Sequence, residues 1–189
     1  NRYMYCGPVK LKLRYFVPKA HGAWAMWIAP LLLGMFCSGF TSGSLLLFIT
    51  AFTLFITHHP VSMAFRKRKS KKIRKYILPS ILTFTLFLFS GGLLVYLYYS
   101  PELLTIGMIT VFILSLHVLL VKFKMGMSFA GQMTGIAGLT MTAPAVYLIN
   151  SGNVNEFSLI LWSLNFLYFS TTIPFVRLKL RIQAKIRYD

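Results

Sequence analysis

The chain has 189 residues, a length that suits one domain, and 57% of them are hydrophobic. This share is above the roughly 45–50% of soluble domains, and with a mean hydropathy of +0.68 it indicates an integral membrane protein. A net charge of +17 is also typical of nucleic-acid-binding domains. Here the cations lie between apolar runs, so membrane topology and anionic lipid headgroups explain them. We therefore expect lipid, and no nucleic acid, as the partner.

Six apolar runs are each long enough to cross the ~30 Å hydrocarbon core of a bilayer as a helix. We predict these spans at residues 22–38, 44–65, 77–99, 103–121, 129–149 and 157–176. A basic leader, residues 1–20, precedes the transmembrane domain at residues 21–176, and residues 177–189 form a basic tail. The leader has no small-residue cleavage site, so we do not expect a cleavable signal peptide. The predicted fold is an all-α, polytopic transmembrane helical bundle.

A basic block between the second and third spans sets the predicted orientation. All 20 Lys and Arg residues lie in the leader, this block, the turn after the fourth span or the tail. Glu102 and Glu156 lie in turns on the opposite side. Because Lys and Arg stay on the cytoplasmic side, we predict that both termini are cytoplasmic. The block residues expected to contact lipid headgroups or a diphosphate are Arg66, Lys67, Arg68, Lys69, Lys71, Lys72, Arg74 and Lys75.

Particular residues within the spans predict how the helices pack. Trp24 and Trp27 lie near the cytoplasmic end of the first span, where indole rings favour the headgroup boundary. Cys37 is expected to be a small packing residue, and neither it nor Cys6 has the spacing of a metal site. The fifth span is rich in small residues, and its Gly131 and Gly135 form a GxxxG pattern typical of close helix packing.

Four histidines lie near the predicted cytoplasmic ends of three spans. His58 and His59 precede Pro60 and lie on the order of 10 Å inside the boundary, and His117 has a similar depth. These imidazoles can satisfy carbonyls that proline leaves free within the second span. Alternatively His21, one of the adjacent pair and His117 converge to bind a metal or haem. The sequence pattern alone assigns no metal site.

Two amides complete the set of candidate polar positions. Gln132 and Asn165 lie inside predicted spans, where an interhelical hydrogen bond or a contact with a substrate would satisfy them. No Asp or Glu lies within any predicted span, which removes the usual signature of proton-coupled or cation-coupled transport. The candidate polar site consists of His21, His58, His59, His117, Asn165 and Gln132.

The first span opens with a specific string, Pro18-Lys19-Ala20-His21-Gly22-Ala23-Trp24. It resembles the opening signature of the YwiC-like family of bacterial membrane proteins. Pro60 followed by a cationic cluster, and the basic turn and Gly/Ala-rich helix over Lys122 to Ala145, are similar to later elements of that family. The resemblance implies a multi-pass protein of the bacterial cytoplasmic (inner) membrane, and it implies no particular activity.

The layout is also distantly similar to that of the UbiA-type prenyltransferases, which hold a magnesium diphosphate with two aspartate-rich motifs. This chain has a single aspartate, Asp189, and no carboxylate at the cytoplasmic ends of its second and fourth predicted spans. The metal therefore cannot be held in that way. In this alternative, the basic block from Arg66 to Lys75 would be the remaining partner of a diphosphate.

Three functional hypotheses remain open from the sequence. The leading one is a YwiC-like membrane component or small-molecule binding module. The alternatives are a UbiA-like transferase or binder of isoprenoid or quinone-type lipids, and a haem or metal carrier that uses the membrane histidines. The residues assign no catalytic group and no cofactor.

Overall fold

Seven helices make up the part of the chain that the structure describes. This structure, a computed structural model, describes residues 21–66, 74–123, 125–126 and 128–186, so the predicted leader at residues 1–20 lies outside it. The helices are α1 (His21–Ser38), α2 (Ser42–Arg66), α3 (Arg74–Leu97), α4 (Pro101–Lys122), α5 (Phe129–Thr140), α6 (Thr142–Ser151) and α7 (Glu156–Ile186). These ranges contain no strand, and the predicted all-α bundle is confirmed.

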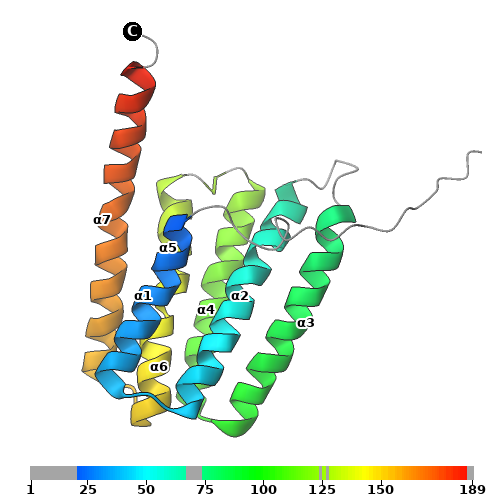
Figure 1. The fold of residues 1–189 in the computed structure, drawn as a ribbon, viewed down its shortest axis with the longest axis vertical. Helices are drawn as coiled ribbons and strands as arrows, with labels where there is room; N and C mark the ends of the chain where they lie inside the picture. Colours follow the sequence, from blue (N-terminus) through cyan, green and yellow to red (C-terminus); the bar gives the residue numbers. More distant parts are fainter. Residues whose placement is uncertain (1–20, 67–73, 124, 127, 187–189) are drawn as a thin grey trace, which may run out of the picture.

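The helices run alternately up and down the bundle, and α5 and α6 together make one pass (Figure 1). α2 is the central helix of the part of the bundle that contains α3, α4 and α6, and it packs against all three. α1 packs mainly against α6, and α7 packs against α5 and α6 before it continues past the end of the bundle (Figure 1). The helix order along the chain therefore does not follow the order of neighbours in space.

A break at Met141 divides the predicted span at residues 129–149 into α5 and α6. The physical reason is Pro144, which has no N–H to donate to the carbonyl of Thr140. Thr140 is fully buried, and its hydroxyl donates to the Ile136 carbonyl at 2.9 Å. By contrast, Pro30, Pro60 and Pro79 lie within continuous helices.

The outer surface of the bundle is apolar. Phe36, Phe89 and Phe112 are 74%, 73% and 71% exposed. Soluble monomers rarely expose contiguous apolar surface on this scale, so the exposed faces fit hydrocarbon. Three helical segments of the described chain are long and apolar enough to cross a membrane: Ser42–Ala64, Tyr76–Leu97 and Pro101–Lys122. The apolar part of α1, Trp24–Ser38, is shorter, and the predicted count of six spans stays a prediction.

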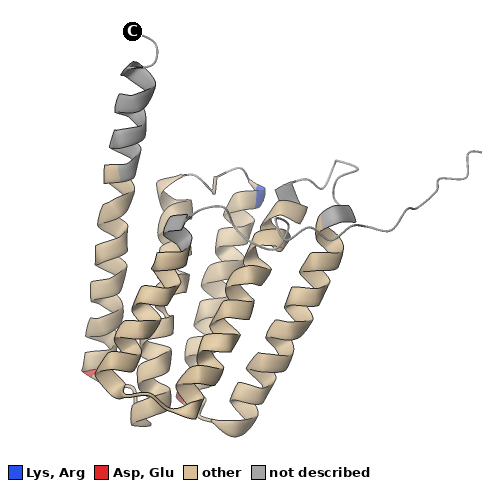
Figure 2. Ribbon diagram, viewed as in Figure 1, with Lys and Arg blue, Asp and Glu red and all other residues tan. Residues whose placement is uncertain are grey.

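The charged side chains that the structure describes lie at opposite ends of the bundle (Figure 2). Lys122 lies in the last turn of α4, whereas Glu102 and Glu156 lie in the first turns of α4 and α7. We refer to these as the Lys122 end and the Glu102 end. The middle of the bundle, between them, shows no described charge (Figure 2).

The main core lies where α1 meets α2 and α6. Trp27 is only 1% exposed, and its ring packs against those of Phe48, Phe52 and Phe55 at centroid distances of 5.4, 5.9 and 5.6 Å. Aromatic packing inside the bundle thus buries the Trp27 indole, and its expected place at the headgroup boundary stays a prediction. The expected packing role of Cys37 is wrong, since that residue is exposed.

Asn150 fixes the end of α6 to the connection between α1 and α2. Its Nδ2 donates to Ser38 Oγ at 2.9 Å and to the Gly39 carbonyl, and its Oδ1 accepts from the Thr41 hydroxyl. Gly39 has a φ of +94°, a conformation that glycine adopts without steric cost. One amide thus holds three chain segments together at the Glu102 end.

The closest approach of α1 to α6 is at Gly34, which provides a test of this packing. A Cβ at Gly34 would lie 2.9 Å from the Ala143 carbonyl oxygen and 3.2 Å from Val146 Cβ. We therefore expect Gly34→Ala to lower the free energy of unfolding by about 1–3 kcal/mol, the usual cost of overpacking. The measurement is the melting temperature in detergent.

Gly107→Ala is the matched control, because a Cβ at Gly107 meets nothing within 4 Å. Alanine favours a helix over glycine, so the control should melt at the wild-type temperature or above it. Equal melting temperatures for the two variants would contradict the close α1–α6 contact.

Candidate functional site

Two imidazoles face each other between α2 and α4. The ring centroids of His58 and His117 are 4.9 Å apart, with the ring planes at 42°. Both side chains are half-buried. His117 lies about 8 Å along α4 from Lys122, so the pair is near the Lys122 end of the bundle. Two of the predicted site residues are thus in direct contact.

His117 is held in place by α5. Its Nδ1 donates to the Gly131 carbonyl at 2.7 Å, and since a carbonyl only accepts, Nδ1 carries the hydrogen. In the neutral ring, Nε2 is then a hydrogen-bond acceptor. The ring packs over Gly135, where a Cβ would come within 3.2 Å of its Cε1 and Nδ1 atoms. The two glycines of the GxxxG pattern therefore supply the acceptor and the space for one imidazole.

His58 is positioned by α2. Its Nε2 lies 3.4 Å from Ser62 Oγ, one helical turn further along. This contact is with a hydroxyl, and no hydrogen bond of the described residues joins His58 to a carbonyl that Pro60 leaves free. His58 also lines a cavity, which is the feature that distinguishes it from a packing residue.

The cavity beside His58 has a volume of ≈ 450 Å³ and lies between α2, α3 and α4. Its polar lining residues are Thr57, His58, Ser115 and Lys122, and the rest of its lining is apolar. The Thr57 hydroxyl donates to the Thr53 carbonyl at 2.6 Å, so its hydrogen is already used within α2. A bound molecule would therefore meet its hydrogen-bonding groups mainly at His58, Ser115 and Lys122.

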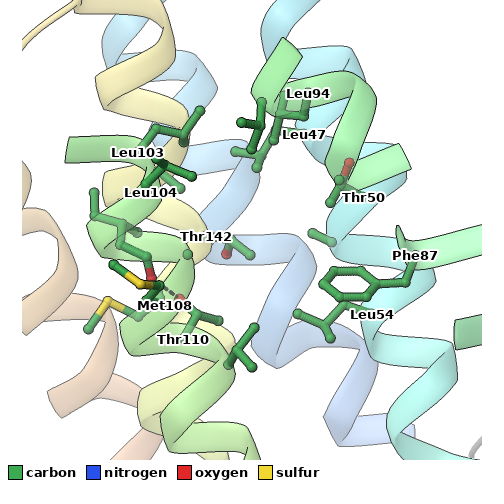
Figure 3. Close-up of a pocket in the computed structure, with 18 of the residues that line it drawn as sticks. Leu47, Thr50, Leu54, Phe87, Leu94, Leu103, Leu104, Met108, Thr110 and Thr142 are labelled. Carbon is green, nitrogen blue, oxygen red and sulfur yellow. Dashed lines mark hydrogen bonds between the residues drawn. The ribbon is translucent and has the colours of Figure 1, made fainter. Parts of the chain in front are cut away.

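A second cavity of ≈ 650 Å³ continues from the first toward the Glu102 end (Figure 3). The two share the lining residues Leu54, Phe87, Val111 and Ser115, so they adjoin each other and together make up a groove along α2 and α4. We call it the α2–α3–α4 groove. α2 and α4 form its walls together with α3, and Met141, Thr142 and Ala145 lie at its base. It stays open because α3 packs on α2, whereas α3 and α4 are not among the closely packed helix pairs of the described chain.

The other predicted polar residues lie apart from the histidine pair or outside the described side chains. His59 follows His58 on α2 and is half-buried, and His21 begins α1 with its side chain undescribed. Asn165, 5% exposed on α7, donates to the Leu161 carbonyl of its own helix at 2.8 Å. This contact is intrahelical, not the expected interhelical one. Gln132 is half-buried on α5.

The basic block falls mostly outside the structure. Arg66 ends α2, and Arg74 and Lys75 begin α3, but their side chains are not described. The block residues outside the described ranges are Lys67, Arg68, Lys69, Lys71 and Lys72. Their predicted contact with lipid headgroups or a diphosphate therefore stays a prediction.

A metal site needs more ligands than the histidine pair offers. Structural and catalytic metal sites generally use three or more protein ligands. Among the described residues, no group of three or more His, Cys, Asp and Glu side chains is placed to hold a metal ion. The described side chains thus bring two imidazoles together, not the three of the metal or haem hypothesis.

The glycines that shape the groove are not among the site residues that the sequence predicted. Gly91, Gly92 and Gly107 line its wider part with Phe87. What they share is a place on the α3 or α4 wall of the groove, and that place depends on how the helices pair. The sequence signal that could have indicated this groove is the presence of glycines inside two apolar spans. Glycine lacks the side chain that would fill such a space.

The fold, apolar exterior and helix lengths define an all-helical integral membrane protein. The sequence model described as "YwiC-like protein" matches residues 17–147, which is more than half of the chain. The chain therefore belongs to the YwiC-like family, as its opening string predicts.

A curated relative, "Uncharacterized protein YwiC" of Bacillus subtilis (strain 168), is 37% identical over 65 residues. That match covers 34% of this chain and 27% of the relative, so it spans about a quarter of the relative's length. No solved structure matches the chain.

The hydrogen bond between His117 and Gly131 can be tested by substitution. We expect His117→Phe to lower the free energy of unfolding by about 0.5–1.5 kcal/mol, because it removes a net-favourable hydrogen bond and keeps a planar ring. The measurement is reversible unfolding in mixed micelles.

His117→Asn is the control, because its side-chain N–H can donate in place of Nδ1. It should retain part of the lost stability. An unfolding curve of His117→Phe that coincides with that of the wild type would show that this bond does not hold α4 to α5.

Proposed function

We propose that this YwiC-like protein is a component of the bacterial cytoplasmic membrane that binds a small molecule in the α2–α3–α4 groove. The observation that carries the proposal is His58, an imidazole within a membrane helix that lines a cavity of ≈ 450 Å³. Polar residues at membrane depth are costly and commonly mark binding sites or pathways. A binding role explains why this position is polar.

Two further features support binding at this place. The ring of His117 lies against that of His58 and is fixed by Gly131, so the two imidazoles are held in one arrangement. Preorganised polar groups bind a ligand at a lower entropic cost than mobile ones. The groove is otherwise lined mainly by apolar side chains, as is usual for small-molecule sites.

The proposal includes the membrane topology. α1, α2, α3, α4, α5 with α6, and α7 are each proposed to cross once, which gives six spans with both termini cytoplasmic. The positions of Lys122 and of the two glutamates at opposite ends of the bundle support this arrangement (Figure 2). The histidine pair then lies near the cytoplasmic boundary, and the basic block contacts anionic headgroups there.

The test is to identify what the purified protein retains. Bound molecules are extracted from protein purified in mild detergent. Mass spectrometry of the extract should detect about one small molecule per protein chain. We expect His58→Leu to reduce this amount about fivefold or more, because the loss of a buried polar partner weakens binding by at least that factor. A visible spectrum recorded in parallel would identify haem or a quinone.

His59→Leu is the matched control, since His59 does not line the cavity. It should retain the molecule at the wild-type level. Identical extracts from wild type and from folded His58→Leu would contradict the proposed binding function.

A further inference from the structure

The α2–α3–α4 groove is long enough to hold a hydrocarbon chain. It is lined from Leu103 near the start of α4 to Lys122 at its end. These residues are about 28 Å apart along the helix axis. That length is close to the ~30 Å hydrocarbon thickness of a bilayer. A chain lying in the groove would thus run parallel to the lipid chains outside it.

The groove changes from apolar to polar along its length. In the wide part, the hydroxyls of Thr50 and Thr110 donate to carbonyls of their own helices at 3.0 and 2.8 Å. The Thr142 hydroxyl, at the start of α6, donates to the Leu139 carbonyl of α5 at 3.0 Å. These hydroxyls therefore present little hydrogen-bonding capacity to a ligand. At the other end, His58 and Lys122 line the cavity. An amphiphilic ligand would match this change in polarity. Its apolar tail would lie toward the Glu102 end and its polar head at the Lys122 end.

The charge at the polar end selects the kind of head group. Among the described side chains that line the groove, Lys122 is the charged one, and its ammonium group favours an anion. α3 and α4 both line the groove and are not closely packed against each other within the described chain, which leaves room for the groove to open between them. A lipid with two chains can therefore place one in the groove and leave the other in the bilayer.

We propose that the ligand of this groove is an anionic phospholipid, with one acyl chain along α4 and its phosphate beside Lys122 and His58. This inference rests on the proposed binding function and deepens it by naming the ligand class. Electrostatic attraction of a juxtamembrane Lys to anionic lipid is enough for a preference of about fivefold over a zwitterionic lipid.

The test is native mass spectrometry of the delipidated full chain, titrated with phosphatidylglycerol or with phosphatidylcholine carrying the same acyl chains. We expect one tightly held phosphatidylglycerol, preferred about fivefold. Lys122→Gln should abolish the preference but leave binding of phosphatidylcholine unchanged. Equal binding of the two lipids to the wild-type protein would overturn the inference.

Gly107→Leu tests the path of the chain. A Cβ at this glycine, which lines the groove, meets nothing within 4 Å, so there is open space where a larger side chain would start. A wild-type melting temperature verifies folding. We expect it to weaken phosphatidylglycerol binding about tenfold, the effect of roughly two methylene groups displaced from an apolar site. Leu164→Phe, at a 60% exposed position on α7, is the control and should bind normally.

The outcomes separate this inference from the proposed function. Equal loss of lipid in Gly107→Leu and Leu164→Phe would assign the binding to the general lipid-facing surface and overturn the inference. Retention of a molecule other than a phospholipid in a His58-dependent manner would also overturn it, yet the proposed binding function would stand. Absence of both a retained molecule and a lipid preference would contradict both.

Discussion

The high cost of charged and unsatisfied polar groups in hydrocarbon is the constraint on which this structure depends. Among the described residues, buried side-chain atoms without a hydrogen-bond partner are Trp27 Nε1, Trp162 Nε1 and Ser170 Oγ. The hydroxyls of Thr57 and Thr140 inside the bundle each donate to a carbonyl of their own helix. His117 finds its acceptor on the next helix, at Gly131. The described charges lie only near helix ends, with Lys122 at one end and Glu102 at the other (Figure 2). His58 stands out because it combines membrane depth with a place in a cavity wall.

The lengths of the apolar runs and the chemistry of proline explain which parts of the fold could be predicted from the sequence. Apolar runs of the right length predicted the helices closely, since a chain in hydrocarbon has few alternatives to a helix. The break at Met141 follows from Pro144, but Pro30, Pro60 and Pro79 lie in helices that continue, so sequence alone does not say which proline interrupts. The burial of the Trp27 ring inside the bundle was not predicted. A helix that is apolar on all sides does not reveal which face meets lipid and which meets protein.

The candidate site was predictable only as a set of residue types. The similar depth of His58 and His117 placed them at one level, and the structure puts their rings in contact. The sequence does not show that α4 packs beside α2 and not beside α3, because this depends on how the helices pair in the tertiary structure. The open space at Gly107 follows from that pairing. Asn165 shows the reverse case, because a buried amide that looked available for another helix is bonded within its own. The proposed binding function thus depends on the gap that helix pairing leaves, and on the polar groups that face it.

The most direct test of the account is the sidedness of the chain, because the groove can present Lys122 to cytoplasmic-leaflet lipids only if all basic segments share one side. Single cysteines at Phe40, Tyr99, Ser151 and Ser70, in a chain with Cys6 and Cys37 replaced by serine, can be treated with a membrane-impermeant thiol reagent in intact cells. The account predicts labelling at the first three positions, and labelling at Ser70 only after the membrane is permeabilised. Labelling at Ser70 in intact cells, or protection at Ser151, would contradict it.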